Sequence, residues 1–221
     1  RLYDVVRNES QIADLLDIEE GAQPILHGNL DETSGTVAVD SSGNGNDGQT
    51  LNMEDEDWDS STGRDCLSFD GANEYIQLQN GSLSTLLSDD LTVSCWARFE
   101  RTNYNDRIFD LAESTADGMQ LAVNPDGGVR IDNRGGITNS ISSVTTNMAG
   151  TWHHMAAVRR GTTVELYIDG VLEASGPTDL HVYTRFFGGS ANDQDFFLSG
   201  RLDDVRVYDE ALSSSELAEL Q

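Results

Sequence analysis

The stretch Val164-Glu165-Leu166-Tyr167-Ile168-Asp169-Gly170-Val171-Leu172-Glu173-Ala174 decides the fold class, because it has the pattern of two short strands joined by a tight turn. Apolar and polar side chains alternate from Val164 to Ile168, as in a half-buried strand. Asp169-Gly170 favours the positive φ angles of a type I′ turn, and a second strand pattern follows it. The segment therefore predicts an antiparallel β-hairpin.

Other short apolar stretches, separated by Gly, Asn and Asp, repeat this pattern along the chain. We expect strands at Ile25–Leu30, Leu67–Phe69, Tyr75–Leu78, Leu91–Phe99, Arg107–Leu111, Met119–Val123, Val129–Asn133, Trp152–Arg159 and Phe196–Tyr208. Helix is expected only as short terminal segments after Asp4 and Asp209. Regular strands with turn signals predict an all-β fold, a sandwich of two antiparallel sheets.

The two ends of the chain resemble each other. Residues 1–15 align without a gap on residues 206–220, with Arg, Tyr, Asp, Ser, Ala and Leu recurring at matched positions. Each copy reads as a strand end followed by a short helix with a capping box, Asn8 with Gln11 and Ser213 with Glu216. We therefore expect residues 1–21 to be the end of a preceding domain, residues 22–221 to form one domain, and the whole to belong to a tandem array.

The charge of the chain is strongly negative. Its 221 residues include 39 acidic and 13 basic ones, which gives a net charge of −26 and an isoelectric point near 4.1. Phosphate backbones and anionic membranes would repel such a surface, and no apolar run approaches the ~20 residues that span a bilayer, so we expect neither nucleic acid binding nor membrane insertion. All the basic residues are arginine. Because salt screens self-repulsion, we interpret the composition as halophilic; the alternative is an acidic, calcium-rich extracellular module.

The cysteines and histidines give no catalytic pattern. Cys66 and Cys95 fit no metal-ligand spacing. An even pair in an extracellular protein suggests a disulfide, whereas strand parity places the two thiols on different faces, so the sequence leaves the bond open. His153 and His154 are adjacent on a predicted strand and point to opposite faces, so we expect one to be buried and hydrogen-bonded and the other to lie at the surface.

Seven motifs in order resemble the laminin-G-like branch of the concanavalin A-like lectin/glucanase superfamily. They are residues 31–35 (DETSG), 40–48 (DSSGNGNDG), 67–71 (LSFDG), 91–96 (LTVSCW), 150–156 (GTWHHMA), 166–170 (LYIDG) and 200–208 (GRLDDVRVY). The resemblance covers the chain from about Ala22 to Gln221. It implies a two-sheet antiparallel jelly roll, concanavalin A-like, that works outside the cell, often in tandem with other modules and commonly with a structural calcium. The family includes sugar binders, adhesion modules and inert spacers, so the fold leaves the function open.

Calcium is the cofactor that the residues favour. The turn over residues 40–48 offers Asp40, Asn44 and Asn46, with Asp47, as hard oxygen ligands, and its glycines allow carbonyl groups to turn inward. The resemblance pairs this turn with Asp203 or Asp204, at the expected start of the last strand, and adds Asp70. The alternative for Asp203 and Asp204 is that one of them accepts backbone hydrogen bonds with no metal.

Candidate ligand-binding residues lie in loop-like stretches. They are Trp58, Tyr104, His181, Tyr183 and Arg185, whose rings and polar groups suit the faces and hydroxyls of a sugar. Trp58 belongs to the acidic run over residues 54–59, which the composition favours as a solvated acidic insertion over a cation-attracting or sugar-stacking loop. We assign Trp96 and Trp152 to the core. Phe186 and Phe187 lie in the same stretch as Arg185, or they plug the end of the sandwich.

The sequence does not favour an enzyme. It has neither the Glu-x-Asp-x-x-Glu strand of laminarinase-type glycosidases nor a Gly-x-Ser-x-Gly elbow. We expect a non-enzymatic, calcium-dependent recognition or adhesion domain on an extracellular, cell or virion surface, with a glycan, a surface protein or neighbouring copies as partners. The alternatives are a spacer or decoration domain of a viral capsid, tail or surface layer, and an accessory domain of a glycan-degrading enzyme.

Overall fold

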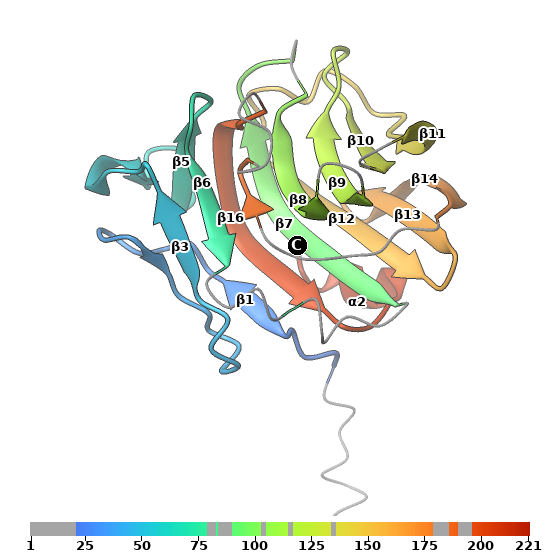
Figure 1. Cartoon of the computed structure of the whole chain (residues 1–221), viewed down its shortest axis with the longest axis horizontal. Coiled ribbons are helices and arrows are strands. Elements are labelled where there is room, and N and C mark those ends of the chain that lie inside the picture. The colour runs from blue at the N-terminus through green and yellow to red at the C-terminus, as the bar shows by residue number, and fades with distance from the viewer. Residues whose placement is uncertain are drawn as a thin grey trace, which may run out of the picture.

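The computed structural model describes residues 21–78, 83, 90–102, 105–114, 117–133, 136–178, 186–189 and 196–221. These residues form two antiparallel sheets, named sheet A and sheet B, that pack face to face. Figure 1 shows the long strands β7 and β16 of sheet A lying side by side. The predicted all-β sandwich is confirmed.

Sheet A carries the long central strands. Its order is β14 (Val171–Pro177), β13 (Thr163–Ile168), β12 (His153–Arg160), β7 (Leu91–Phe99), β16 (Ser199–Tyr208), β5 (Cys66–Asp70) and β4 (Trp58–Asp59), and β1 (Leu26–Gly28) also pairs with β16.

Sheet B is the second layer. Its order is β11 (Gly136–Ser142), β10 (Val129–Asn133), β9 (Asp117–Val123), β8 (Arg107–Ser114), β15 (Phe186–Phe187), β6 (Tyr75–Leu78), β3 (Gly48–Leu51) and β2 (Val37–Ala38). The described residues also include a 3-10 turn, η1 (Asp55–Asp57), and one α-helix, α2 (Ser214–Ala218).

The alternating side chains build the core between the sheets. In β7, Val93, Cys95, Ala97 and Phe99 are buried in the central cluster, and β8 and β9 contribute Phe109, Leu111, Met119 and Leu121 from the other layer. The predicted hairpin is β13–β14, with Ile168 opposite Val171. Asp169 and Gly170 both have positive φ, 48° and 73°, as a type I′ turn requires.

The expected strands are all present, with shifted ends at several of them. The strand patterns of the sequence did not indicate β2, β3, β4, β11 and β15. Phe186 and Phe187, expected in a loop or as a plug, form β15, a buried two-residue bridge between β6 and β8. The predicted end of a preceding domain, with its helix after Asp4, lies outside the described residues.

The C-terminal segment covers part of the outer face of sheet A. Helix α2 has the predicted capping box between Ser213 and Glu216. Leu212 and Leu217 pack with Val158 and Tyr208 in a second apolar cluster on this face. Arg160 of β12 donates to the backbone oxygens of Ala211 and Leu212, which fixes the segment to the sheet.

The two cysteines are free thiols on opposite faces of sheet A. Cys95 belongs to the core cluster, whereas Cys66 points outward and contacts the backbone oxygen of Asp59. Strand β16 lies between β5 and β7, so the two thiols are in strands that do not touch. The parity argument against a disulfide is confirmed.

Candidate functional site

A break in sheet A creates a polar hollow at the surface. On one side of β16, β5 pairs with residues 199–202 and β1 pairs with residues 205–207, so Asp203 and Asp204 lie at the gap between these two strands. The register on β7 also shifts there, and Asp204 has a φ of 50°. A bulge of this kind lets two consecutive side chains face the same side. Both carboxylates therefore lie in the middle of β16, not at its start as expected.

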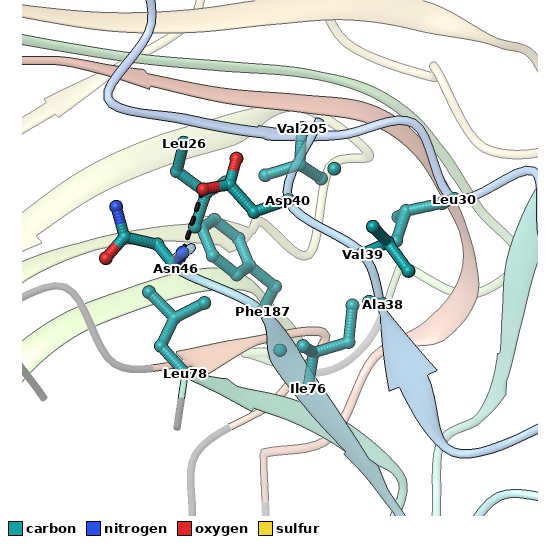
Figure 2. Close-up of a pocket in the computed structure, with 12 residues that line it drawn as sticks. Leu26, Leu30, Ala38, Val39, Asp40, Asn46, Ile76, Leu78, Phe187 and Val205 are labelled. Atoms are coloured by element: carbon teal, nitrogen blue, oxygen red, sulfur yellow. Dashed lines mark hydrogen bonds between the residues drawn. The ribbon is translucent and has the colours of Figure 1, made fainter. Parts of the chain in front are cut away.

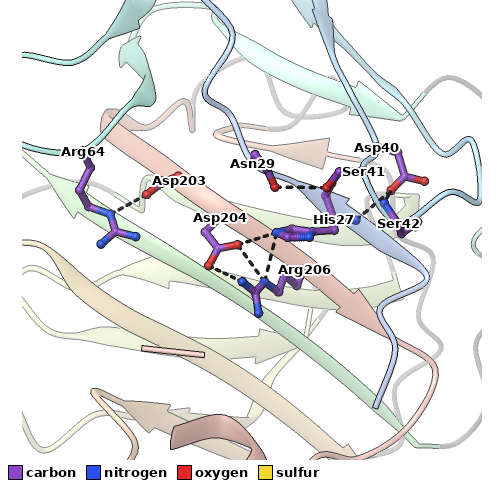
Figure 3. A network of polar contacts seen from close by, with 9 residues as sticks. All are labelled: His27, Asn29, Asp40, Ser41, Ser42, Arg64, Asp203, Asp204 and Arg206. Atoms are coloured by element: carbon purple, nitrogen blue, oxygen red, sulfur yellow. Dashed lines mark hydrogen bonds and ion pairs between the residues drawn. The ribbon is translucent and has the colours of Figure 1, made fainter. Parts of the chain in front are cut away.

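Asp204 is held by Arg206 and His27 (Figure 3). Its carboxylate accepts two hydrogen bonds from Arg206, from Nε at 2.8 Å and from Nη2 at 2.9 Å. A third contact joins its Oδ1 to His27 Nε2 at 2.7 Å, which connects β16 to β1. The three side chains are 19–24% exposed, so they line an opening and are not part of the core.

Asp203 is paired with a different arginine. Arg64, from the segment before β5, donates from Nε to Asp203 Oδ2 at 2.5 Å. The guanidinium carbon of Arg64 lies 4.2 Å from the ring centroid of Trp96 and 5.8 Å from that of Trp152. Trp96 lies directly opposite Asp203 on β7, and its other neighbour, on β12, is His154. One arginine thus connects the acidic gap to two indole rings.

These groups border an open cleft of about 430 Å³. Its lining is polar and comes from β1 and the segment after it, from the segment before β5 and from β16: His27, Asn29, Asp31, Gly63, Arg64, Asp65, Asp203, Asp204 and Arg206. We call it the sheet A cleft. Most of its hydrogen-bonding side chains are fixed by one another, so the surface presented to a ligand is preorganised.

The two neighbouring carboxylic acids of the cleft differ electrostatically. Burial raises the pKa of Asp203 above its usual value, and the Arg64 guanidinium offsets this only in part. Burial also acts on Asp204, but His27 and Arg206 outweigh it and lower the pKa of that group. The cleft therefore keeps Asp204 strongly ionised and makes Asp203 the easier of the two to protonate.

The predicted calcium ligands of the 40–48 turn are engaged in hydrogen bonds. Asp40 accepts from the backbone N–H groups of His27, Ser42 and Asn46 at 2.8–3.0 Å, and these bonds lower its pKa although burial raises it. Asn44 and Asn46 donate to the backbone oxygen of Ile25. Hydrogen bonds from the polar groups of the turn therefore hold it against β1 and the residue before it.

Beneath this turn lies an apolar cavity of about 20 Å³ (Figure 2). Leu26, Leu78, Ile76, Phe187 and Val205 surround it, and Asp40 closes it by accepting a hydrogen bond from the Asn46 N–H. The volume suits about one water molecule, and the lining offers few polar groups to hold even that. The inner side of the turn is therefore not a cation pocket.

The six predicted ligands do not converge on one point. Asp40 is connected to Asp204 only through His27, while Asp70 lies at the end of β5 opposite Ser199 and accepts from the Ala72 N–H. Among the described residues, no group of three or more His, Cys, Asp and Glu side chains is placed to hold a metal ion. Asp203 and Asp204 already bind guanidinium groups, so this arrangement does not fit calcium. The side-chain positions therefore do not support the structural calcium expected from the sequence, which a metal-binding measurement has yet to test.

Of the predicted ligand-binding residues, only Trp58 is described. It lies in β4, donates from its indole Nε1 to the Gly35 oxygen at 3.0 Å, and borders a hollow of about 130 Å³. That hollow shares Asp31 and Asp65 with the sheet A cleft. Tyr104, His181, Tyr183 and Arg185 lie outside the described residues.

The acidic run over residues 54–59 is only partly the solvated loop that the sequence suggested. Its exposed residues form η1, but Asp59 belongs to β4 and binds Arg201 at 2.7 Å. Hydrogen bonds from Ser61 and Arg201 lower the pKa of Asp59 to about 2. This carboxylate is therefore a structural ion-pair partner in the sheet.

The assignment of Trp96 and Trp152 to the core is wrong. Both are half-buried, and the outer face of sheet A carries Trp96 while its neighbours Cys95 and Ala97 point into the core. The sequence held a signal for this, because strict alternation in β7 puts Trp96 on the face opposite Cys95. Nothing in the sequence marked Arg64 or His27, since their roles depend on contacts with residues more than a hundred positions away.

The adjacent histidines divide as expected in burial. His154 is 2% exposed beside Trp96, and burial lowers its pKa to about 4. His153 is more exposed and contacts Asp169 at 2.7 Å through Nδ1, in the turn of the β13–β14 hairpin. The two imidazole rings lie in different surroundings because adjacent residues of a strand point to opposite faces of the sheet.

A second polar row crosses the outer face of sheet B. Asp110, Gln120 and Asp132 lie opposite one another on β8, β9 and β10, and Arg130 donates to Asp132 at 2.5 Å. These three residues are 0–8% exposed. A ligand could not reach them without a rearrangement, whereas the sheet A cleft is open, so the cleft is the stronger candidate site.

The two packed antiparallel sheets define a β-sandwich, and family comparison agrees with this fold. A family model of the concanavalin A-like lectin/glucanases superfamily matches residues 70–218. The chain therefore belongs to this superfamily. No curated protein sequence matches it.

Solved structures with the same fold include proteins of several kinds. Domain 4 of AbnA, an extracellular arabinanase from Geobacillus stearothermophilus in complex with arabinotriose, has a TM-score of 0.62 and 21% identity over 91% of this chain and 99% of that one. A Trypanosoma rangeli sialidase has a TM-score of 0.69 and 16% identity over 90% of this chain and 32% of the sialidase. The binding domain of botulinum neurotoxin serotype D has a TM-score of 0.65 and 16% identity, over 90% and 50%. This chain thus spans about a third of the sialidase and half of the toxin domain, and at these identities the likeness shows the fold alone.

Proposed function

We propose that this chain is a non-enzymatic carbohydrate-recognition module that binds an oligosaccharide in the sheet A cleft. The observation that carries the proposal is the open cleft of about 430 Å³, where side-chain donors and acceptors are fixed next to a guanidinium group stacked on indole. A few convergent polar groups give a site its orientation and specificity. Sugars offer paired hydroxyls that match such groups.

The structural relatives support a sugar as the ligand. Domain 4 of the arabinanase corresponds to this chain over nearly its whole length and was solved with arabinotriose. The sialidase and the toxin binding domain extend well beyond the matched part, so they contribute less to the proposal. A module of this size needs no further domain to build the cleft, because β1, β5 and β16 all belong to this chain.

The carboxylates of the cleft favour binding over hydrolysis. Retaining glycosidases place two carboxyl groups about 5–5.5 Å apart on either side of the scissile bond, one of them free to attack the sugar. Asp204 instead accepts three hydrogen bonds from Arg206 and His27, and Asp203 binds Arg64. Both groups are committed to neighbouring cations, so they serve better as fixed hydrogen-bond acceptors for hydroxyl groups.

We place the module outside the cell, in a high-salt setting. No helix among the described residues is long and apolar enough to cross a membrane. The arabinanase relative is an extracellular protein. A net charge of −26 without lysine suits a solution in which salt screens the repulsion between carboxylates.

A glycan array, probed with the labelled chain in 2 M potassium chloride, tests the proposal. We expect at least one neutral or charged glycan class to bind, and Arg64→Met to weaken that binding at least tenfold, because the guanidinium donors are lost while the apolar stem remains. The matched control is Arg98→Met, which changes an arginine on the same strand as Trp96 that does not line the cleft. A folded chain that binds no glycan would make the structural-spacer alternative the better one. Release of sugar from a bound glycan would instead identify an enzyme.

A further inference from the structure

The charge balance of the sheet A cleft distinguishes between classes of sugar. Four carboxylates line it, those of Asp31, Asp65, Asp203 and Asp204, against the two guanidinium groups of Arg64 and Arg206. Each arginine is already paired, Arg64 with Asp203 and Arg206 with Asp204. Even a protonated His27 would leave the cleft with an excess of negative charge. The charge of each lining arginine is therefore already balanced by a carboxylate of the cleft.

Asp31 and Asp65 supply this excess. Both are exposed at the rim of the cleft, and neither is bonded to an Arg or His side chain among the residues that the structure describes. Both also border the neighbouring hollow beside Trp58. A ligand that extended from the cleft toward Trp58 would therefore pass two uncompensated carboxylates.

We infer that the cleft accepts neutral oligosaccharides and discriminates against sialylated, uronic or sulfated ones. The inference rests on the proposed function and names its ligand class. Carboxylates that hold a partner on one side can still accept hydrogen bonds from sugar hydroxyls, whereas a carboxylate or sulfate on the sugar would meet like charges. Specificity of this kind comes from the unfavourable contact with the wrong partner as much as from the favourable one with the right partner.

Arg64 supplies the donor side of the same recognition. Its Nε is used by Asp203, and within the described part of the chain its two terminal amino groups have no acceptor. Because the guanidinium plane is held between Asp203 and the indole of Trp96, these groups are fixed in direction. Two neighbouring sugar oxygens suit such donors without needing a negative charge.

The test uses matched pairs of glycans on one array, each pair identical except for a terminal sialic acid or a uronic acid in place of the neutral sugar. At 0.1 M potassium chloride we expect the neutral member to bind about tenfold more tightly, which is the scale of one or two partly screened charge repulsions. The double variant Asp31→Asn with Asp65→Asn should reduce the difference to about threefold or less. The matched control, Glu54→Gln with Glu56→Gln, removes the same charge from η1 and its cap outside the cleft and should leave the difference unchanged.

The outcomes separate this inference from the proposed function. Tighter binding of the acidic member of the pairs would overturn the inference while leaving glycan binding intact. The inference also fails if the cleft double variant and the control double variant change the selectivity equally, because the discrimination would then come from overall charge. Absence of binding to every glycan by a chain that is folded by circular dichroism would overturn the proposed function and the inference together.

Discussion

Removal of the Asp204 carboxylate tests how the cleft is built. In Asp204→Asn the side chain keeps its size and its tolerance for a positive φ, but the charge-assisted bonds to Arg206 and His27 are lost. A hydrogen bond to a charged group contributes about 1.5–3 kcal/mol, and the partial exposure of all three groups lets water compensate for some of the loss. We expect the free energy of unfolding to fall by about 2 kcal/mol.

Two further substitutions at the same position separate the carboxylate from the backbone. Asp204→Ala loses the same bonds and also places a side chain without local hydrogen bonding at a φ of 50°, so it should cost about 1 kcal/mol more than Asp204→Asn. Asp204→Gly loses the bonds without that strain and should be less destabilised than Asp204→Ala. Urea unfolding at one salt concentration measures all three, and Glu56→Gln on exposed η1 is the charge-matched control, with an expected change below about 0.5 kcal/mol.

The same series decides whether calcium belongs to this site. Because Arg206 and His27 occupy the Asp204 carboxylate, a chelator at constant ionic strength should leave the midpoint of wild-type unfolding unchanged. A bound ion would instead stabilise the native state by mass action, about 2.7 kcal/mol at a hundredfold excess over the dissociation constant. If the chelator destabilises the wild type but not Asp204→Asn, Asp204 is a calcium ligand, and the argument from its occupied carboxylate is refuted.

Three other predictions concern the rest of the molecule. Thermal stability should rise as potassium chloride goes from tens of millimolar to molar, because screening weakens the repulsion within a chain of net charge −26; melts that do not respond to salt would contradict the halophilic interpretation. Burial raises the pKa of Glu74 from 4.5 to about 7, so ionisation of this group destabilises the fold as the pH rises through that range. Glu74→Gln should therefore stabilise the chain by about 1–2 kcal/mol in urea melts at pH 8 but not at pH 4. Gly188 has a φ of 73° and lies against the ring of Phe69, so Gly188→Ala should cost about 2–3 kcal/mol in the same assay, and a near-neutral result would show that the core can yield there.

The sequence was informative wherever a local pattern determines the structure. The alternation in β7 and the Asp169-Gly170 turn of the β13–β14 hairpin identified strands that the structure contains. The capping box at Ser213 located the one helix among the described residues, because it satisfies the backbone of that helix locally. Strand β15 could not be found in this way. Its two residues owe their strand conformation to pairing with β6 and β8, which lie far away in the sequence.

The candidate site was only partly predictable for a related reason. Sequence reasoning singled out Asp203 and Asp204, but it could not show that β1 and β5 leave a gap beside them or that a bulge turns both to one face. The partners Arg64 and His27 come from distant segments and carry no motif of their own. The 40–48 turn shows the opposite case, because its Asp and Asn residues match calcium chemistry in type while their lone pairs and N–H groups are used by the backbone.

A site made of paired charges has a consequence for recognition at high ionic strength. At 1 M salt the Debye length is about 3 Å, so attraction between a charged ligand and an exposed, oppositely charged surface is largely lost. Contacts at hydrogen-bond distance, such as Arg64 with Asp203 at 2.5 Å, lie within that length and persist. A ligand recognised through hydroxyl hydrogen bonds would therefore keep its affinity as salt rises, whereas one recognised by net charge would not. Salt screens the repulsion between the acidic groups on the surface of this chain, and it would also screen any attraction of a charged ligand. The arginines of the cleft are paired internally, so the cleft is suited to neutral sugars.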